Sequence, residues 1–134
     1  MYATVMSKNC SIFSLSGVAI LVTGGNAGTS AEVLLEDGTP WCSLPGLPED
    51  RHGHSQSGLV TCGGLYTLSS CVTFTDGGWS WSHNLTHERY EHSSWTSPVH
   101  GTILIGGDVL GYTTEMLKDT GVAQESFPLK YRTR

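Results

Sequence analysis

The sequence predicts an all-β protein built from three repeated units. A short apolar, β-branched run that ends in two glycines occurs three times, over residues 17–25, 58–64 and 101–107. The double glycines end at positions 25, 64 and 107, so the copies are 39 and 43 residues apart. Runs of this length suit buried strands, and a nearly constant interval indicates an array of repeats. No segment shows the sustained 3.6-residue apolar period that an amphipathic helix has.

The composition fits this class and argues against several others. The chain has 134 residues, 17 of them glycine, with 14% charged and 38% hydrophobic residues. Many glycines and few charges suit tight turns between short strands, and the hydrophobic content argues against disorder. The formal net charge of −5 provides no basic surface for nucleic acid. A nucleic-acid partner is therefore not expected. No apolar stretch approaches the ~20 residues of a membrane-spanning helix, so no membrane span is expected either.

Two further strands are expected in each unit after the glycine-closed run. Middle strands are predicted at residues 32–35, 71–74 and 115–118, and outer strands at 41–44, 79–82 and 125–129. The sequences Asp37-Gly38, Asp76-Gly77 and Asp119-Thr-Gly121 separate them. Asp-Gly is a strong hairpin signal because both residues tolerate positive φ.

A polar connector repeats after the outer strand. Arg51-His-Gly-His54 follows Gly25, and Arg89-Tyr-Glu-His92 follows Gly64, at nearly the same interval. A segment containing serines follows each histidine and is expected to add a strand, so each unit has four short antiparallel strands. The units are placed at residues 17–57, 58–100 and 101–134. Residues 1–16 are a lead-in, either the end of a preceding unit or unstructured.

This order of features resembles the kelch repeat. The first two units match at the double glycine, at a tryptophan in the predicted outer strand and at the Arg-x-x-His connector, and the third matches at its double glycine and middle strand. The matching residues are Gly24, Gly25, Trp41, Arg51, His54, Gly63, Gly64, Trp79, Trp81, Arg89, His92, Gly106 and Gly107. The resemblance covers residues 17–129 and implies a kelch-type β-propeller of four-stranded antiparallel blades.

The number of units implies an incomplete propeller. Kelch propellers generally close with about five to seven blades, whereas this chain supplies two and a fraction. Three explanations fit: a piece of a longer protein, several copies that assemble, or an open arc with exposed edges. The first explanation would also account for the lack of a recognisable signal peptide, because residues 1–16 match one poorly.

The cysteines help to indicate the cellular compartment of the protein. They are Cys10, Cys42, Cys62 and Cys71. Cys62 ends one predicted strand and Cys71 begins the next, so a disulfide between neighbouring antiparallel strands is expected, although two small buried thiols would have the same spacing. The disulfide and the Asn-x-Ser/Thr sequences at Asn9 and Asn84 favour a secreted protein glycosylated at Asn84, with a cytoplasmic location as the alternative.

The repeated connectors suggest either a catalytic or ligand-binding pair, or a structural role. Active sites are rarely duplicated in every repeat. We therefore expect Arg51, His54, Arg89 and His92 to form structural clasps that bond backbone carbonyls where one blade crosses to the next. No phosphate-binding loop, nucleophile elbow or carboxylate pair is present in the sequence, so no catalytic residue is predicted.

Histidines and tryptophans allow two more specific interpretations. His83 and His87 are closely spaced, but no cysteine or carboxylate completes a tetrahedral set, so neither a metal site nor a cofactor is predicted. Trp79, Trp81 and Trp95 would suit a platform for a carbohydrate, because sugars stack on exposed aromatic faces. Packing within and between blades is the expected role.

These features favour a non-catalytic protein-interaction scaffold. The loops after the double glycines, over residues 26–30, 65–70 and 108–113, differ between otherwise matched units, and propeller loops commonly bind partners. A glycan-binding module is one alternative. An enzyme is another, since some kelch-type propellers resemble galactose oxidase, a copper enzyme. That enzyme type needs a tyrosine–cysteine pair with histidine ligands, an arrangement that cannot be assigned in this sequence.

Overall fold

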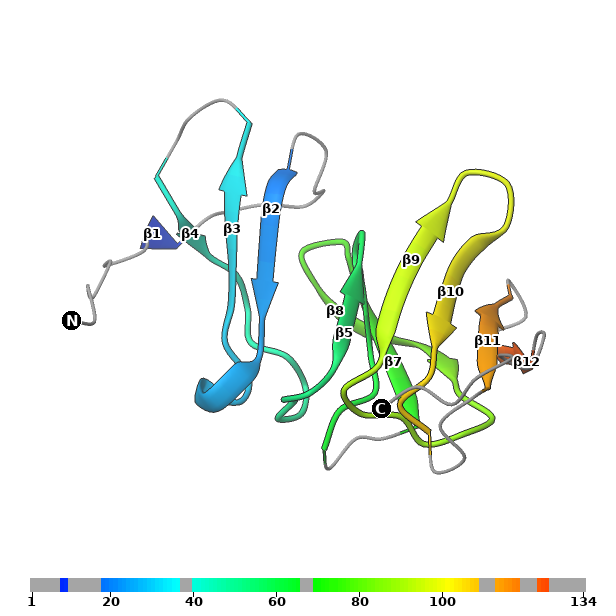
Figure 1. Ribbon diagram of the computed structural model, residues 1–134. Coiled ribbons are helices and arrows are strands. Elements are labelled where there is room, and N and C mark those ends of the chain that lie inside the picture. The colour runs from blue at the N-terminus through cyan, green and yellow to red at the C-terminus, as the bar shows by residue number, and fades with distance from the viewer. Residues whose placement is uncertain are drawn as a thin grey trace.

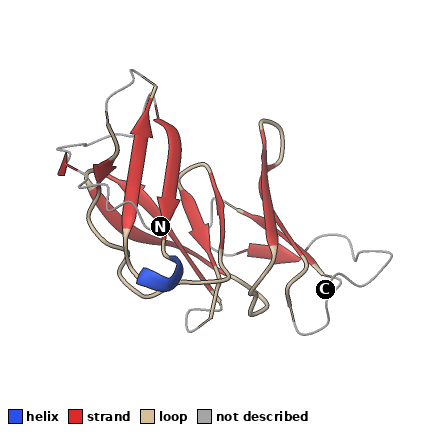
Figure 2. Cartoon of the chain, turned by 60° about the vertical axis from the view of Figure 1, so that its left-hand side comes forward, coloured by secondary structure: helices blue, strands red, loops and turns tan. Residues whose placement is uncertain are grey.

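The computed structural model describes residues 8–9, 18–36, 40–65, 69–108, 113–118 and 123–125. The elements in these ranges are twelve strands, β1–β12, and one 3-10 turn, η1 (Gly25–Ala27), so the predicted all-β class is confirmed (Figure 2). The strands form three four-stranded sheets, named A, B and C here, which stand in a row along the molecule (Figure 1). Within the described ranges, no helix has the length and apolar character needed to cross a membrane.

Sheets B and C have the four-stranded antiparallel form that the sequence predicts. Sheet B consists of β5 (Ser55–Ser57), β6 (Val60–Cys62), β7 (Ser70–Thr75) and β8 (Gly78–Asn84). Sheet C consists of β9 (Ser93–Ser97), β10 (Gly101–Ile105), β11 (Thr114–Leu117) and β12 (Ala123–Glu125). Every strand in these sheets pairs with its neighbour in the chain. The strand after each connector histidine pairs with the following glycine-closed run, so the unit predicted over 17–57 straddles sheets A and B.

Sheet A departs from this form at one edge. It consists of β1 (Lys8–Asn9), β2 (Val18–Thr23), β3 (Ala31–Leu35) and β4 (Cys42–Ser43), in the order β1-β4-β3-β2. β1 lies beside β4 and is parallel to it, whereas β2, β3 and β4 are antiparallel. Part of the predicted lead-in is therefore a strand at the outer edge of the first sheet.

The hairpin between β7 and β8 forms as predicted. Asp76 and Gly77 have φ angles of 51° and 81° at its turn, the positive values that the Asp-Gly sequence allows. The hairpin signals at Asp37-Gly38 and Asp119-Thr-Gly121 lie outside the described residues, as do residues 126–129 of the last predicted outer strand.

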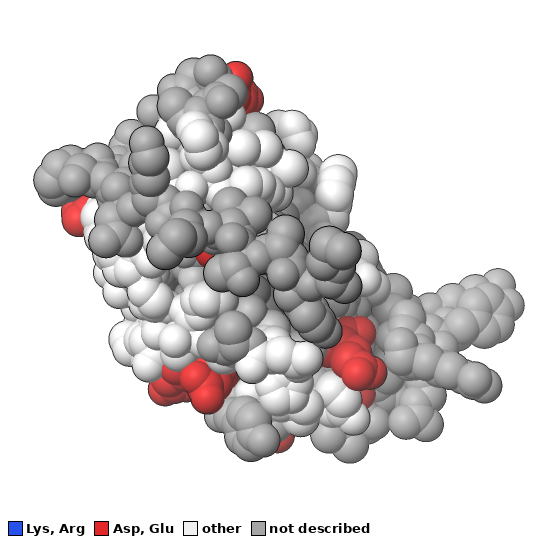
Figure 3. Space-filling model, turned by 90° about the vertical axis from the view of Figure 1, so that its left-hand side faces the viewer, with Lys and Arg blue, Asp and Glu red and all other residues white. Residues whose placement is uncertain are grey.

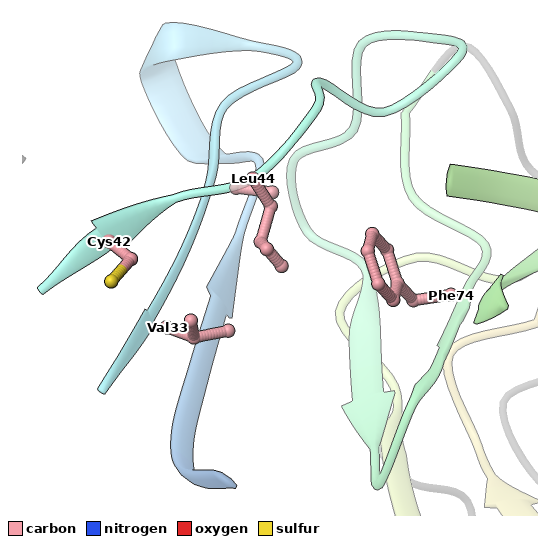
Figure 4. Close-up of a cluster of buried hydrophobic side chains, with 5 residues drawn as sticks. Val33, Cys42, Leu44 and Phe74 are labelled. Carbon is pink, nitrogen blue, oxygen red and sulfur yellow. The ribbon is translucent and has the colours of Figure 1, made fainter. Parts of the chain in front are cut away.

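Two hydrophobic clusters fill the spaces between successive sheets. Between sheets A and B, Val33 and Leu44 point toward Phe74 of β7, and Ala31 and Cys42 belong to the same cluster (Figure 4). Trp79 packs against this cluster, with its ring edge-on to Phe74 at 5.4 Å between centroids. The first cluster therefore attaches sheet A to sheet B.

The second cluster contains a disulfide. Cys62 and Cys71 are opposed across β6 and β7 and form the predicted disulfide. They pack with Leu85 and with Leu104 of β10. The disulfide is thus part of the contact between sheets B and C.

Successive sheets use equivalent faces for this packing. Val22, Thr61 and Leu104 each stand two residues before the first glycine of their unit. Thr61 and Leu104 are both 0% exposed, whereas Val22 in sheet A is 53% exposed. The sheets are therefore stacked in one direction, and the corresponding side of sheet A is open.

Candidate functional site

The double glycines and the connectors lie together at one edge of the sheets, which we call the crossing edge (residues 24–30, 45–54, 63–65, 85–92 and 106–108). In Figure 1 the loops of this edge lie along the bottom. Backbone hydrogen bonds join them: Gly25 N–H donates to the carbonyl of Arg51 at 2.8 Å, and Gly64 N–H to that of Arg89 at 2.9 Å. Glu91 N–H donates to the Gly53 carbonyl at 2.6 Å and so joins the two connectors to each other.

The first glycine of the first two pairs is required by close packing at this edge. At Gly24, φ is +65° and a Cβ atom would stand 2.3 Å from the Arg51 carbonyl oxygen. At Gly63, φ is +66° and a Cβ atom would stand 2.4 Å from the Arg89 carbonyl oxygen. A side chain is therefore excluded at both places by backbone conformation and by space.

Arg51 is buried and reaches into sheet B. Its Nη1 donates to the carbonyls of Gly63 at 3.0 Å and Ser70 at 2.8 Å, and its Nη2 donates to the Ser70 hydroxyl at 2.8 Å. The guanidinium lies over the ring of Trp81, 5.9 Å from the centroid. Burial lowers the pKa of Arg51, and the nearby charge of Glu49 opposes this shift.

Arg89 repeats these contacts one sheet further along. Its Nη1 donates to the carbonyls of Gly106 at 2.6 Å and Thr113 at 3.0 Å, and its Nη2 donates to the Thr113 hydroxyl at 2.6 Å. Two carboxylates accompany it: Glu115 accepts a hydrogen bond from Nε at 2.5 Å, and Asp108 lies 3.5 Å from Nη1. These arginine contacts are the clasps to backbone carbonyls that the sequence predicts.

The two clasps differ in their carboxylates. Val72 in sheet B stands where Glu115 stands in sheet C, two residues after the hydroxyl residue of the clasp. Arg51 Nε accordingly has no hydrogen-bond partner in the structure. Glu115 also accepts hydrogen bonds from the backbone N–H and the hydroxyl of Thr86. Pro48 occupies the position of Thr86 in the first connector. Since proline has no backbone N–H, the first clasp lacks the backbone donor that Glu115 accepts in the second clasp.

The connector histidines bond hydroxyl groups through Nε2, a type of partner that the sequence did not predict. His54 Nε2 is 3.1 Å from the Thr23 hydroxyl, and His92 Nε2 is 2.6 Å from the Ser55 hydroxyl. Burial lowers the pKa of both imidazoles, and the charge of the neighbouring arginine lowers it further. The pKa of His92 falls to about 4, so this imidazole is neutral at physiological pH.

The tryptophans named by the sequence have separate positions. The Trp79 indole N–H donates to the Pro45 carbonyl at 2.8 Å, which ties sheet B to the chain after β4. Trp41 is half-buried just before β4. Trp81 and Trp95 are each 57% exposed. Trp79 is thus a packing residue, so only Trp81 and Trp95 of the three candidate tryptophans are exposed enough to stack on a sugar.

Other candidate residues are placed as follows. Asn84 is exposed at the end of β8. His83 Nε2 lies 2.8 Å from the carbonyl oxygen of Lys118, which directly follows β11 of sheet C. Among the described residues, no three His, Cys, Asp or Glu side chains are grouped so that they hold a metal ion. Of the predicted variable loops, residues 66–68 and 109–112 lie outside the described ranges.

The exposed charge of the crossing edge is acidic. Glu49, Asp50, Glu88 and Glu91 are exposed, whereas the arginines of this edge are buried. Tyr90, 47% exposed, lies between two of these carboxylates in the sequence. From the side of sheet A, Figure 3 shows acidic groups and no lysine or arginine among the described residues. This surface suits a ligand that carries positive charge and an apolar group.

Sequence reasoning missed the acceptors of the clasps. Ser70 and Thr113 each follow the first glycine of their unit by seven residues. This repeated hydroxyl position was a usable signal. Asp108 and Glu115 occur in one unit only, so no repetition pointed to them.

No protein-family model matches the chain, and no curated protein matches it either. The relation to kelch repeats therefore depends on the pattern of residues described above.

Proposed function

We propose that this chain is a segment of a kelch-type β-propeller that serves as a non-catalytic protein-interaction scaffold, with the crossing edge as its binding surface. The supporting observation is the pair of matching arginine clasps. They give successive sheets the same rigid joint, while the exposed residues around the joint differ. A fixed frame with variable exposed positions is what a binding surface requires.

The chemistry of the edge defines the partner further. Carboxylates of Glu88 and Glu91 flank Tyr90, and all three side chains are exposed. An extended peptide with lysine or arginine beside an apolar residue matches this arrangement, because the charges steer its approach and the aromatic ring supplies buried area. The proposed partner is therefore a basic segment of another protein.

A peptide selection tests this proposal. A displayed library of random peptides is selected against the chain, and the enriched peptides are expected to be basic. Their affinity should fall at least tenfold on the Glu88→Lys variant and stay within twofold on Glu36→Lys. Glu36 follows β3 in the chain and is exposed like Glu88, so the two variants make the same change of charge. Equal binding to both variants would remove the crossing edge as the binding surface.

The proposed role is non-catalytic because the polar side chains that recur from unit to unit are engaged in structural hydrogen bonds. Arg51 and Arg89 bond the next sheet, and His54 and His92 bond hydroxyl groups. Metal analysis of the purified protein, combined with an oxidase assay, tests the copper-enzyme alternative. Bound copper with turnover would contradict the scaffold.

Exposed tryptophan keeps glycan binding as a second candidate. Trp81 and Trp95 are exposed on different sheets, so each would act as a single stacking site. Glycan-array binding that disappears on Trp81→Ala or on Trp95→Ala would favour this function over peptide binding.

We also propose an extracellular location with glycosylation at Asn84. The Cys62–Cys71 disulfide and the exposure of Asn84 support it, since disulfides persist in oxidising compartments. Expression through a secretory pathway should yield a protein whose mass falls on treatment with a glycosidase, and Asn84→Gln should abolish that shift.

A further inference from the structure

The acceptor sequence for glycosylation, Asn84-Leu85-Thr86, lies where sheet B meets sheet C. Asn84 is the last residue of β8, where it pairs with Ser70 of β7, and its side chain is exposed. The folded molecule therefore has room for a glycan at this position. The enzyme that attaches a glycan, however, recognises the three residues of Asn-x-Ser/Thr together. Whether the folded chain is a substrate thus depends on Leu85 and Thr86 as well.

The middle residue of this sequence is held inside the molecule. Leu85 is 7% exposed and packs in the cluster that contains the disulfide, and its N–H donates to the Ser69 carbonyl at 2.8 Å. Leu47 has the same place in the first connector, where it is 4% exposed and its N–H donates to the Thr29 carbonyl at 2.7 Å. The repetition indicates an anchor of the connector, which leaves its place only when the contact between the sheets opens.

The third residue is bound to a carboxylate of the next sheet. The Thr86 hydroxyl donates to Oε1 of Glu115 at 2.5 Å, and the Thr86 backbone N–H donates to the same oxygen. Glu115 belongs to β11 of sheet C and is 0% exposed, and its other oxygen accepts from Arg89. Hydrogen bonds to a charged acceptor are stronger than those between neutral groups. In the folded chain, the hydroxyl that the enzyme must recognise is therefore already engaged.

The acceptor sequence and this carboxylate occur together. In the first connector Pro48 stands at the place of Thr86, so no acceptor sequence is present there, and Val72 stands at the place of Glu115. The connector without an acceptor sequence thus meets a sheet without the carboxylate that would hold its third residue. The contact between Thr86 and Glu115 is therefore an addition to the repeated clasp, made only where the acceptor sequence lies.

We propose that Asn84 is glycosylated only before sheet C docks on sheet B, and that docking closes the site by engaging Thr86 with Glu115. This proposal rests on the glycosylation at Asn84 proposed above. In the reaction, the side-chain amide nitrogen of Asn84 bonds to C1 of the first sugar of an oligosaccharide carried on a lipid diphosphate. The bond from C1 to the diphosphate breaks, the lipid diphosphate leaves with its electron pair, and the nitrogen gives up one proton to a base of the enzyme.

The order of the elements along the chain sets the interval in which the site is open. Glu115 lies 29 residues beyond Thr86, so the acceptor sequence is complete well before its carboxylate partner is made. Because the Asn84 side chain is exposed in the folded chain, a glycan attached in this interval leaves the docking of sheet C unobstructed. The occupancy of Asn84 therefore reports a competition between glycan transfer and docking, and slower docking raises it.

Glycan transfer to the full chain in two states tests the proposal. A purified oligosaccharyltransferase with its lipid-linked oligosaccharide receives either the folded, oxidised protein or the same chain unfolded by reduction and alkylation of its cysteines. The unfolded chain should be modified at Asn84 at least about tenfold faster, because only the small open fraction of the folded chain is a substrate. Product that persists on Asn84→Gln arises elsewhere and is subtracted. Equal rates would overturn the proposal, and an absence of product from both chains would overturn the glycosylation itself.

Variants of the folded protein test the part played by Glu115. Glu115→Ala removes the acceptor of the Thr86 hydroxyl and should be modified at least about threefold faster than the wild type, because local opening at this contact becomes more frequent. Glu115→Gln, which keeps an oxygen acceptor and loses the charge, should change the rate less in the same direction, and it serves if the alanine variant does not fold. Gly24→Ala is the control, since it disturbs the crossing edge at Arg51, away from the acceptor sequence, and should stay within about twofold of the wild type. Equal acceleration by the alanine variants at both positions would show that only global unfolding exposes the sequence, which would overturn the role of Glu115.

Discussion

A glycine-to-alanine comparison tests the account of the crossing edge most directly. Gly63 and Gly58 both have a positive φ, of +66° and +59°. They differ in their surroundings: a Cβ at Gly63 would stand 2.4 Å from the Arg89 carbonyl oxygen, whereas a Cβ at Gly58 meets nothing within 4 Å. Alanine at the two positions therefore separates the cost of conformation from the cost of space.

The expected magnitudes follow from these surroundings. Alanine at a positive φ costs about 1–2 kcal/mol, and both variants incur a cost of this kind. At Gly63 the added methyl must push away a backbone oxygen, which costs about 1–3 kcal/mol for overpacking. It also breaks the bond from Gly64 N–H to that oxygen, worth about 1 kcal/mol. Gly63→Ala should thus be destabilised by roughly 2–4 kcal/mol more than Gly58→Ala.

Urea unfolding under oxidising conditions, followed by tryptophan fluorescence, measures this difference. The first unit offers a replicate, since a Cβ at Gly24 would stand 2.3 Å from the Arg51 carbonyl oxygen and one at Gly25 meets nothing within 4 Å. Free energies of unfolding within about 0.5 kcal/mol of each other in both pairs would refute the reasoning, since surface substitutions alone vary by that amount.

Three further predictions concern the buried polar groups and the disulfide. Glu115→Gln should lower the free energy of unfolding by up to about 3–5 kcal/mol, because it removes the nearer of the two carboxylates that accompany the buried Arg89, and chemical denaturation at neutral pH measures the loss. Stability should fall as pH decreases from about 6.5 to about 4, because the unfolded chain then binds a proton at His92 that the folded chain, with a pKa of about 4, does not. Between pH 7 and pH 5 this loss amounts to about 2 kcal/mol, and it should be absent from His92→Gln in unfolding curves at these two pH values; an equal loss in both proteins would contradict it. Replacing both Cys62 and Cys71 by alanine should cost at least about 2–3 kcal/mol, since the bridge closes a short loop of the unfolded chain; a midpoint equal to that of the oxidised protein would count against this.

The sequence predicted the repeated features of this fold better than the unique ones. Glycine-closed strands, the Asp76-Gly77 turn and the Cys62–Cys71 pair all come from local chemistry that is visible in a few adjacent residues. The parallel pairing of Lys8–Asn9 with β4 has no local signal, because a two-residue strand has no periodicity. Glu115 was also missed, because its partner Arg89 lies 26 residues away and the pair occurs in one unit only.

The connector histidines show where local reasoning ends. Their repetition indicated a structural role, and both imidazoles do form structural bonds. Their hydroxyl partners, Thr23 and Ser55, lie 31 and 37 residues away in sequence. Which hydroxyl meets which ring depends on how the sheets stack, and this information is absent from the connector itself.

The span of the arginine contacts bears on the order in which the molecule assembles. Arg51 bonds carbonyls 12 and 19 residues further along the chain, and Arg89 bonds carbonyls 17 and 24 residues further along. Each joint therefore needs only the next stretch of polypeptide to be complete, and loops of this size close at low entropic cost. A nascent chain can secure each sheet as the following segment leaves the ribosome, without waiting for its end. Evolution can likewise add or remove whole units while every remaining joint keeps its chemistry.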